Sequence, residues 1–174
     1  MKLNEVLKQP VKYDLVRTSP NYVYVFHTPN MSIDVNINPC KWPASDVVAE
    51  FLIGKLREKQ ATNNITIDDL KKEYGGVYEI TFQPAGSSYF GMTNIHKDMF
   101  KIIGTVVQIV KDFVETHHTA ELTFVANKKE ESRVRLYDRL VHDIPQSVNF
   151  TLVEKLDGGD RYHYMLANND LLEL

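Results

Sequence analysis

Cysteine is nearly absent from this chain. Cys40 is the only cysteine among 174 residues, so no intramolecular disulfide can form and no zinc site can be built from several thiolates. Cys40 could act as a nucleophile, although an inert, buried thiol is the commoner role of a single cysteine. The sequence therefore fits a reducing, cytosolic compartment.

Long apolar runs and an excess of one charge are also missing. No segment approaches the roughly 20 consecutive apolar residues that span a bilayer, and residues 1–8 lack the apolar run of a signal peptide. The formal net charge is -3 with no long run of Lys or Arg, whereas phosphate contacts need clustered basic residues. We therefore expect a soluble protein that is not secreted, does not enter a membrane and does not bind nucleic acid.

The chain has enough apolar residues to form one hydrophobic core. The residue pattern of its first half is typical of β-strands. The hydrophobic content is 43%, and a chain of this length predicts a single domain. Residues 31–38 alternate strictly between apolar and polar side chains, which is typical of a half-buried strand. Turn signals at residues 19–21 and 28–30 separate three strand-like runs, and this arrangement predicts an antiparallel meander.

The rest of the chain mixes helices and strands. Helical periodicity and capping signals predict helices over 45–60, 66–74, 97–116 and 132–140, and apolar runs predict strands over 77–82, 120–126, 148–153 and 161–167. The helix 97–116 is so apolar that it must be packed between other layers. These elements predict an α/β (α+β) domain with a mostly antiparallel central sheet and flanking helices. The strand-helix-strand step from 77 to 126 could be a parallel crossover.

The order strand, loop, long helix, strand and helix, with the segment Arg135-Leu136-Tyr137-Asp138-Arg139-Leu140, resembles the GCN5-related N-acetyltransferases. The resemblance implies an acyltransferase-like fold over residues 1–174, in detail over 77–167. In many members of that family, the tyrosine of this Leu-Tyr step is the general acid that protonates the departing thiolate of coenzyme A. The resemblance assigns that role to Tyr137. The alternative is that Tyr137 only packs its ring and forms a hydrogen bond at a rim.

The same resemblance points to a loop that should hold the cofactor. Family members bind the coenzyme pyrophosphate with a Gln/Arg-x-x-Gly-x-Gly/Ala loop at a helix N-terminus, where free N–H groups and the helix dipole favour an anion. By position, the binding residues here are Gly91, Thr93 and Asn94. This loop has no second glycine at the family's spacing. Asp98 also places a carboxylate in the first turn of the helix, where it would repel phosphate. The sequence therefore predicts that the protein has no cofactor. Acetyl-coenzyme A is the cofactor that the resemblance would allow.

Further residues are candidates if the chain is an enzyme. Glu79 lies in the strand that lines the acyltransferase cleft in the family, where its carboxylate could deprotonate a substrate amine. Solvent exposure on an alternating strand explains Glu79 equally well. His163 could belong to a site if the last strand lines a cleft, and strand packing is the alternative. No metal site is expected at His117 and His118, because adjacent helical residues point about 100° apart.

The segment from Tyr89 to Leu140 also resembles uncharacterised bacteriophage proteins, which have the same long helix and a similar Ser-Arg-x-x-Leu-Tyr helix. Two hypotheses follow. The first is a non-catalytic, phage-type protein that uses an acyltransferase-like scaffold for protein–protein contacts, in the host cytoplasm or as a virion component. The alternative is an acetyl-coenzyme-A-dependent N-acyltransferase. The glycine-poor loop favours the first.

A protein partner or a homo-oligomer is expected under either hypothesis. The strands of the first half carry apolar residues on both faces, and exposed apolar patches are normally covered. We expect the Tyr and Phe side chains of residues 13–26 at the contact.

Overall fold

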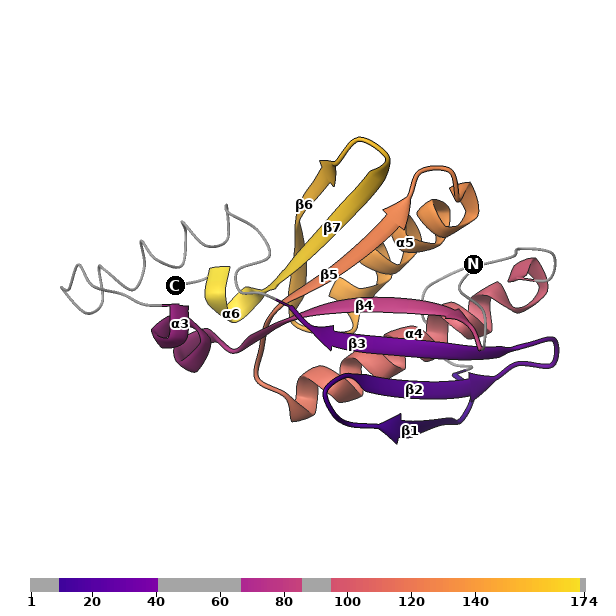
Figure 1. Ribbon diagram of the computed structural model, residues 1–174, viewed down its shortest axis with the longest axis horizontal. Helices are drawn as coiled ribbons and strands as arrows, with labels where there is room; N and C mark the ends of the chain where they lie inside the picture. Colours follow the sequence, from indigo (N-terminus) through magenta and orange to yellow (C-terminus); the bar gives the residue numbers. More distant parts are fainter. Residues whose placement is uncertain (1–9, 41–66, 86–94, 173–174) are drawn as a thin grey trace.

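The computed structural model describes residues 10–40, 67–85 and 95–172, and within them it confirms the predicted fold class (Figure 1). The predicted helix over residues 45–60 lies outside the described residues. The described elements are β1 (Tyr13–Arg17), β2 (Tyr22–His27), β3 (Ser32–Pro39), α3 (Ile67–Tyr74), β4 (Gly76–Pro84), α4 (Ile95–Thr116), β5 (Thr119–Asn127), α5 (Glu131–Asp143), η1 (Ile144–Gln146), β6 (Phe150–Asp157), β7 (Arg161–Asn168) and α6 (Asn169–Leu172).

The strands form one mixed sheet. Within the described residues, seven strands lie in the order β1-β2-β3-β4-β5-β7-β6. All neighbouring strands are antiparallel except β4 and β5, which are parallel and joined through α4. The predicted meander and the parallel crossover are therefore confirmed, and the last two predicted strands pair as an antiparallel hairpin. The order β4, α4, β5, α5 is also the order of elements that the family resemblance implies.

The alternation in β3 divides the two faces of the sheet as predicted. Ile33, Val35 and Ile37 have no exposed surface, and they belong to one buried cluster with the apolar side of α4. Tyr24 and Phe26 of β2 join the same cluster, 6% and 0% exposed. These two rings are covered by the protein's own long helix, so the expectation that they form an intermolecular contact was wrong. Self-association itself stays a prediction.

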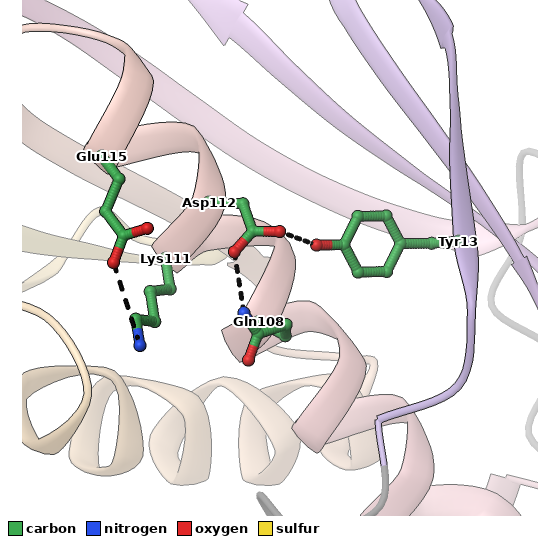
Figure 2. Close-up of polar contacts among 5 residues, drawn as sticks. All are labelled: Tyr13, Gln108, Lys111, Asp112 and Glu115. Carbon is green, nitrogen blue, oxygen red and sulfur yellow. Dashed lines mark hydrogen bonds and ion pairs between the residues drawn. The ribbon is translucent and has the colours of Figure 1, made fainter.

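The helix α4 is the spine of this core, as its sequence predicts. Seven of its apolar side chains are 0–1% exposed: Ile102, Ile103, Val106, Val107, Ile109, Val110 and Phe113. Its polar side anchors the edge of the sheet, because Asp112 accepts hydrogen bonds from the Tyr13 hydroxyl and from the Gln108 side chain (Figure 2). The helix is thus held both by apolar packing and by a polar contact to β1.

Gly75 sets the position of the parallel strands. It ends α3 with φ of 95°, a conformation that glycine adopts readily. A Cβ atom here would lie 2.5 Å from the carbonyl oxygen of His118. The next residue, Gly76, donates its N–H to that same oxygen over 2.9 Å. This close approach, which only glycine permits, brings the start of β4 against the start of β5.

The two parallel strands then separate. Their pairing runs from Gly76 opposite Thr119 to Glu79 opposite Thr123, while β4 continues to Pro84 and β5 to Asn127. Figure 1 shows β4 and β5 diverging toward their C-terminal ends, with α5 behind them. We call the region between Ile80–Pro84 of β4 and Phe124–Asn127 of β5 the β4–β5 opening. At this opening, side chains of α5 on one side of the sheet come close to residues on the other side.

Candidate active site

Tyr137 fills the β4–β5 opening from the helix side. Its neighbours Leu136, Leu140 and Val141 form the buried stripe of α5, which turns this tyrosine toward the sheet. The ring of Tyr137 makes edge contacts with Phe82 of β4 at 5.2 Å and with Phe124 of β5 at 5.5 Å. Only 1% of the side chain is exposed. The ring packing that the alternative predicted is present, but Tyr137 lies in the interior between both strands and not at a rim. Its role as a general acid stays a prediction.

The hydroxyl of Tyr137 is held in its protonated form. Burial raises the pKa of this phenol, and the nearby charges of Glu79 and Glu130 raise it further. The cation of Arg133 and a hydrogen bond from the backbone N–H of Phe82 lower the pKa, but they do not outweigh burial. Because the oxygen accepts a hydrogen bond from Phe82, its own proton points toward a different acceptor. Tyr137 therefore carries a proton that it can donate at neutral pH.

A pocket of about 300 Å³ lies on the opposite face of the sheet. Strand alternation places its lining residues there, because Ile80, Phe82, Leu122 and Phe124 point to the helices and the residues between them point away. The lining residues come from five segments: Cys40, Glu79, Thr123, Val125, Leu156, Arg161, His163 and Met165. The structure thus brings together the predicted candidates Glu79 and His163, and it adds Arg161, which the sequence pattern did not single out.

The charged groups of this pocket have no partner among the described residues. Among the residues that the structure describes, the side chains of Glu79, Arg161 and His163 make no hydrogen bond or ion pair. Arginines elsewhere are paired: Arg135 with Glu131 at 3.6 Å and Arg139 with Asp143 at 3.0 Å. The two helix arginines therefore form salt-bridged surface, whereas the pocket keeps charges of both signs available.

Cys40 lies in this pocket but is not an activated nucleophile. Its backbone N–H donates to the carbonyl of Val77 over 2.9 Å, which extends the pairing of β3 with β4 by one residue. Burial and the charge of Glu79 raise the pKa of the thiol, and hydrogen bonds from the Glu79 amide and the Thr123 side chain only partly offset this. Because the thiolate is the reactive form, the raised pKa favours the inert role.

Glu121 is a buried carboxylate that sequence reasoning missed. It lies on the same face of β5 as Thr123 and is 0% exposed, and neither carboxyl oxygen has a hydrogen-bond partner in the described part of the chain. Burial, with a smaller contribution from the charge of Glu154, raises the pKa of Glu121 to about 8. The one available signal was a charged residue inside an otherwise apolar strand. The charge of Glu121 also reaches Cys40, so it lies close to the pocket.

The predicted cofactor residues Gly91, Thr93 and Asn94 lie outside the described residues. Asp98, in contrast, is described and does lie in the first turn of α4, with 4% of its surface exposed. Its carboxylate accepts a hydrogen bond from the Asn30 amide over 2.8 Å and another from Thr28. Burial raises the pKa of Asp98, but these hydrogen bonds outweigh it and the net pKa is lowered. A stable negative charge therefore sits where an anion would approach the helix.

No group of three or more His, Cys, Asp or Glu side chains in the described residues could hold a metal ion. None of the helices in the described ranges is long and apolar enough to cross a membrane.

Comparisons with known proteins give only distant likenesses. No protein-family model matches the chain, and no curated protein matches its sequence. Among solved structures, NAA60 of Arabidopsis thaliana in complex with acetyl-CoA is similar with a TM-score of 0.43 and 14% identity, over 96% of this chain and 93% of that one. RimL, a ribosomal L7/L12 alpha-N-protein acetyltransferase in an apo form, is similar with a TM-score of 0.32 and 9% identity, over 88% and 98%.

An uncharacterised protein of Bacillus halodurans is similar with a TM-score of 0.41 and 9% identity. The likeness covers 91% of this chain, which spans 64% of the length of that protein. Likenesses as distant as these three carry no argument about activity.

Proposed function

We propose that this chain is an acetyl-coenzyme-A-dependent N-acyltransferase. The observation that carries the proposal is the opposition of Tyr137 and Glu79 at the β4–β5 opening. Tyr137 reaches the opening from α5, and Glu79 lies beside it on the pocket face, close enough for its charge to raise the pKa of the phenol. A general acid and a general base that face one gap from two sides are what amine acylation requires.

The residues of the opening fit the thioester end of the cofactor. The backbone N–H of Phe82 points into the opening, since it bonds the Tyr137 hydroxyl there rather than a strand partner. When bound, acetyl-coenzyme A supplies an acyl group that is already activated as a thioester. Glu79 accepts the proton that the acceptor amine loses on forming the amide bond. Tyr137 holds a proton at its phenol oxygen for the sulfur atom that departs.

The first test combines binding and turnover. Calorimetry with acetyl-coenzyme A measures affinity, and release of free thiol in the presence of amines measures transfer. Tyr137→Phe keeps the ring between Phe82 and Phe124 but removes the proton donor. We expect this variant to lose about 10²-fold in kcat while its affinity for acetyl-coenzyme A stays nearly unchanged.

Tyr164→Phe is the matched control. Tyr164 is 0% exposed and donates its hydroxyl proton to Asp138 over 2.9 Å. The centre of its ring lies 6.2 Å from the centre of the Tyr137 ring. Loss of the Tyr164 hydroxyl removes a comparable hydrogen bond outside the β4–β5 opening. We therefore expect kcat to stay unchanged. Equal losses of kcat in both variants would remove Tyr137 from the mechanism.

The non-catalytic, phage-type scaffold is the second candidate, and Asp98 is the observation that favours it. An ionised carboxylate in the first turn of α4 opposes binding of a pyrophosphate at that end. Under this alternative, acetyl-coenzyme A does not bind saturably at millimolar concentration, and the chain acts through a protein partner or a second copy of itself. Sedimentation equilibrium at tens of micromolar decides about self-association, because a strict monomer leaves only a foreign partner.

A further inference from the structure

The pocket opposite α5 carries charges of opposite sign at its two ends. Glu79 is in register with Thr123 of β5, which is in register with Met165 of β7. Arg161 lies on the same face of β7, four residues from Met165, which is about 13 Å along the strand. His163 lies between them. A ligand in this pocket therefore meets a carboxylate at one end and a guanidinium with an imidazole toward the other.

Apolar side chains also line the pocket between its charged ends. Val125, Leu156 and Met165 line it between the charged ends. Its volume of about 300 Å³ lies at the low end of the range for small-molecule sites, which run from roughly 300 to 1,000 Å³. Such a space suits a short aliphatic chain, since methylene groups gain free energy when they leave water for apolar contacts.

The charges at both ends are free to bind a ligand. Within the described residues, Glu79 and Arg161 have no side-chain partner, although ion pairs are common on the rest of the described surface. The planar fork of an arginine matches a carboxylate with two parallel hydrogen bonds. Glu79, conversely, attracts the ammonium form of an amine. The ammonium gives one proton to solvent before attack, and Glu79 takes the second as the amide bond forms in the proposed reaction.

On the basis of the proposed function, we infer that the acceptor is an amino carboxylate: a small molecule whose primary amine and carboxylate are joined by a short aliphatic spacer. The amine lies at Glu79 beside the β4–β5 opening, and the carboxylate lies at Arg161. A simple alkylamine leaves Arg161 without a partner. A diamine places a second cation against Arg161, where like charges repel.

The test uses three probes with the same six-carbon chain: 6-aminohexanoate, hexylamine and 1,6-diaminohexane. Each is titrated by calorimetry into the protein without acetyl-coenzyme A. We expect 6-aminohexanoate to bind roughly tenfold tighter than hexylamine, the gain of one charge-assisted contact, and the diamine to bind more weakly than both. Equal affinity for all three probes, or no binding of any at millimolar concentration, overturns the inference.

Two variants assign the ends of the pocket. Arg161→Gln should abolish the advantage of 6-aminohexanoate while leaving hexylamine affinity unchanged, and Glu79→Gln should weaken both. Arg135→Gln is the control, because it removes the same charge from an exposed arginine that pairs with Glu131 outside the pocket. If Arg161→Gln behaves like Arg135→Gln, Arg161 does not bind the carboxylate and the inference is overturned.

The binding assay separates this inference from the proposed function. If 6-aminohexanoate binds as described but receives no acetyl group, the pocket assignment stands and the acyltransferase proposal fails. If hexylamine and 6-aminohexanoate are acetylated with equal kcat/KM, the acyltransferase proposal stands and the acceptor class is wrong.

Discussion

The two faces of the sheet use the same strands in opposite ways. On the face toward α4 and α5, side chains such as Val35, Phe82 and Phe124 are 0–1% exposed and pack as one apolar cluster. On the other face, the alternate residues include Glu79, Arg161 and His163, which keep their charge or polarity without a partner in the described part of the chain. Packing explains the first face completely. The second face carries the charged side chains on which the proposed acceptor site rests.

The same contrast separates two buried carboxylates. Asp98 at the start of α4 is 4% exposed and receives hydrogen bonds from Thr28 and Asn30, so its pKa is lowered. Glu121 on the pocket face is 0% exposed and receives none, so burial raises its pKa to about 8. Both carboxylates have little exposed surface, but Glu121 lies deeper, and only Asp98 has hydrogen bonds that lower its pKa.

The largest expected effect comes from placing a charge on the helix face. Val107 is 1% exposed in α4, so Val107→Asp buries a carboxylate with no partner. The cost should be on the order of several kcal/mol, a large share of the roughly 5–15 kcal/mol that stabilises a typical domain. Val25→Asp adds the same group at a half-buried position on the opposite face of β2, and it should cost far less. Thermal denaturation compares the two, and similar melting midpoints would contradict the division of the faces.

A smaller effect, dependent on pH, is expected at Glu121. Its pKa is 4.5 as a free group and about 8 in the folded protein, so the unfolded state loses its proton first as pH rises. The stability contributed by this group is therefore fully present below pH 4.5 and is lost as pH rises through 8. Glu121→Gln should stabilise the protein by about 2–4 kcal/mol at pH 9 and have little effect at pH 4. Urea denaturation at both pH values measures this, and a gain that is the same at both would show that Glu121 does not titrate as described.

Asp98 should show the opposite dependence on pH. Because its folded pKa is lowered, the carboxylate contributes stability above the unfolded value of 3.8, and that stability is lost as pH falls through the folded pKa. Asp98→Asn should cost about 1–2 kcal/mol at pH 7, from the weakened hydrogen bonds, and the difference should shrink in acid. The same variant should bind acetyl-coenzyme A more tightly, because it removes a negative charge from the first turn of α4. Unchanged affinity with a normal pH profile would show that the pyrophosphate does not approach this turn.

The smallest effect is expected at the edge of the sheet. Tyr13→Phe removes the hydrogen bond from β1 to Asp112 (Figure 2) but keeps the ring, and it should cost about 1 kcal/mol. Lys111→Ala removes an exposed ion pair to Glu115 on the same helix and should change stability by less than about 0.5 kcal/mol. Equal effects in chemical denaturation would mean that Asp112 does not anchor β1.

The sequence by itself determined the local structure. The strict alternation over residues 31–38 and the apolar width of the helix 97–116 each reflect a requirement of neighbouring residues, and each was confirmed. Asp98 was also placed correctly, because a residue's position within a helical turn follows from the helix start. The sequence also indicated Glu79 and Tyr137 as candidates for acid–base chemistry.

Only the tertiary structure decided which of these groups meet. The divergence of β4 from β5 beyond Glu79 depends on contacts between strands 40 residues apart in the chain, and no local pattern encodes it. That divergence puts Tyr137 in the interior rather than at a rim, and it places Glu79 on the opposite side of the same gap. Arg161 and Glu121 became candidate residues only in the tertiary structure. Burial and the absence of a partner among the described residues depend on side chains from several segments of the assembled sheet.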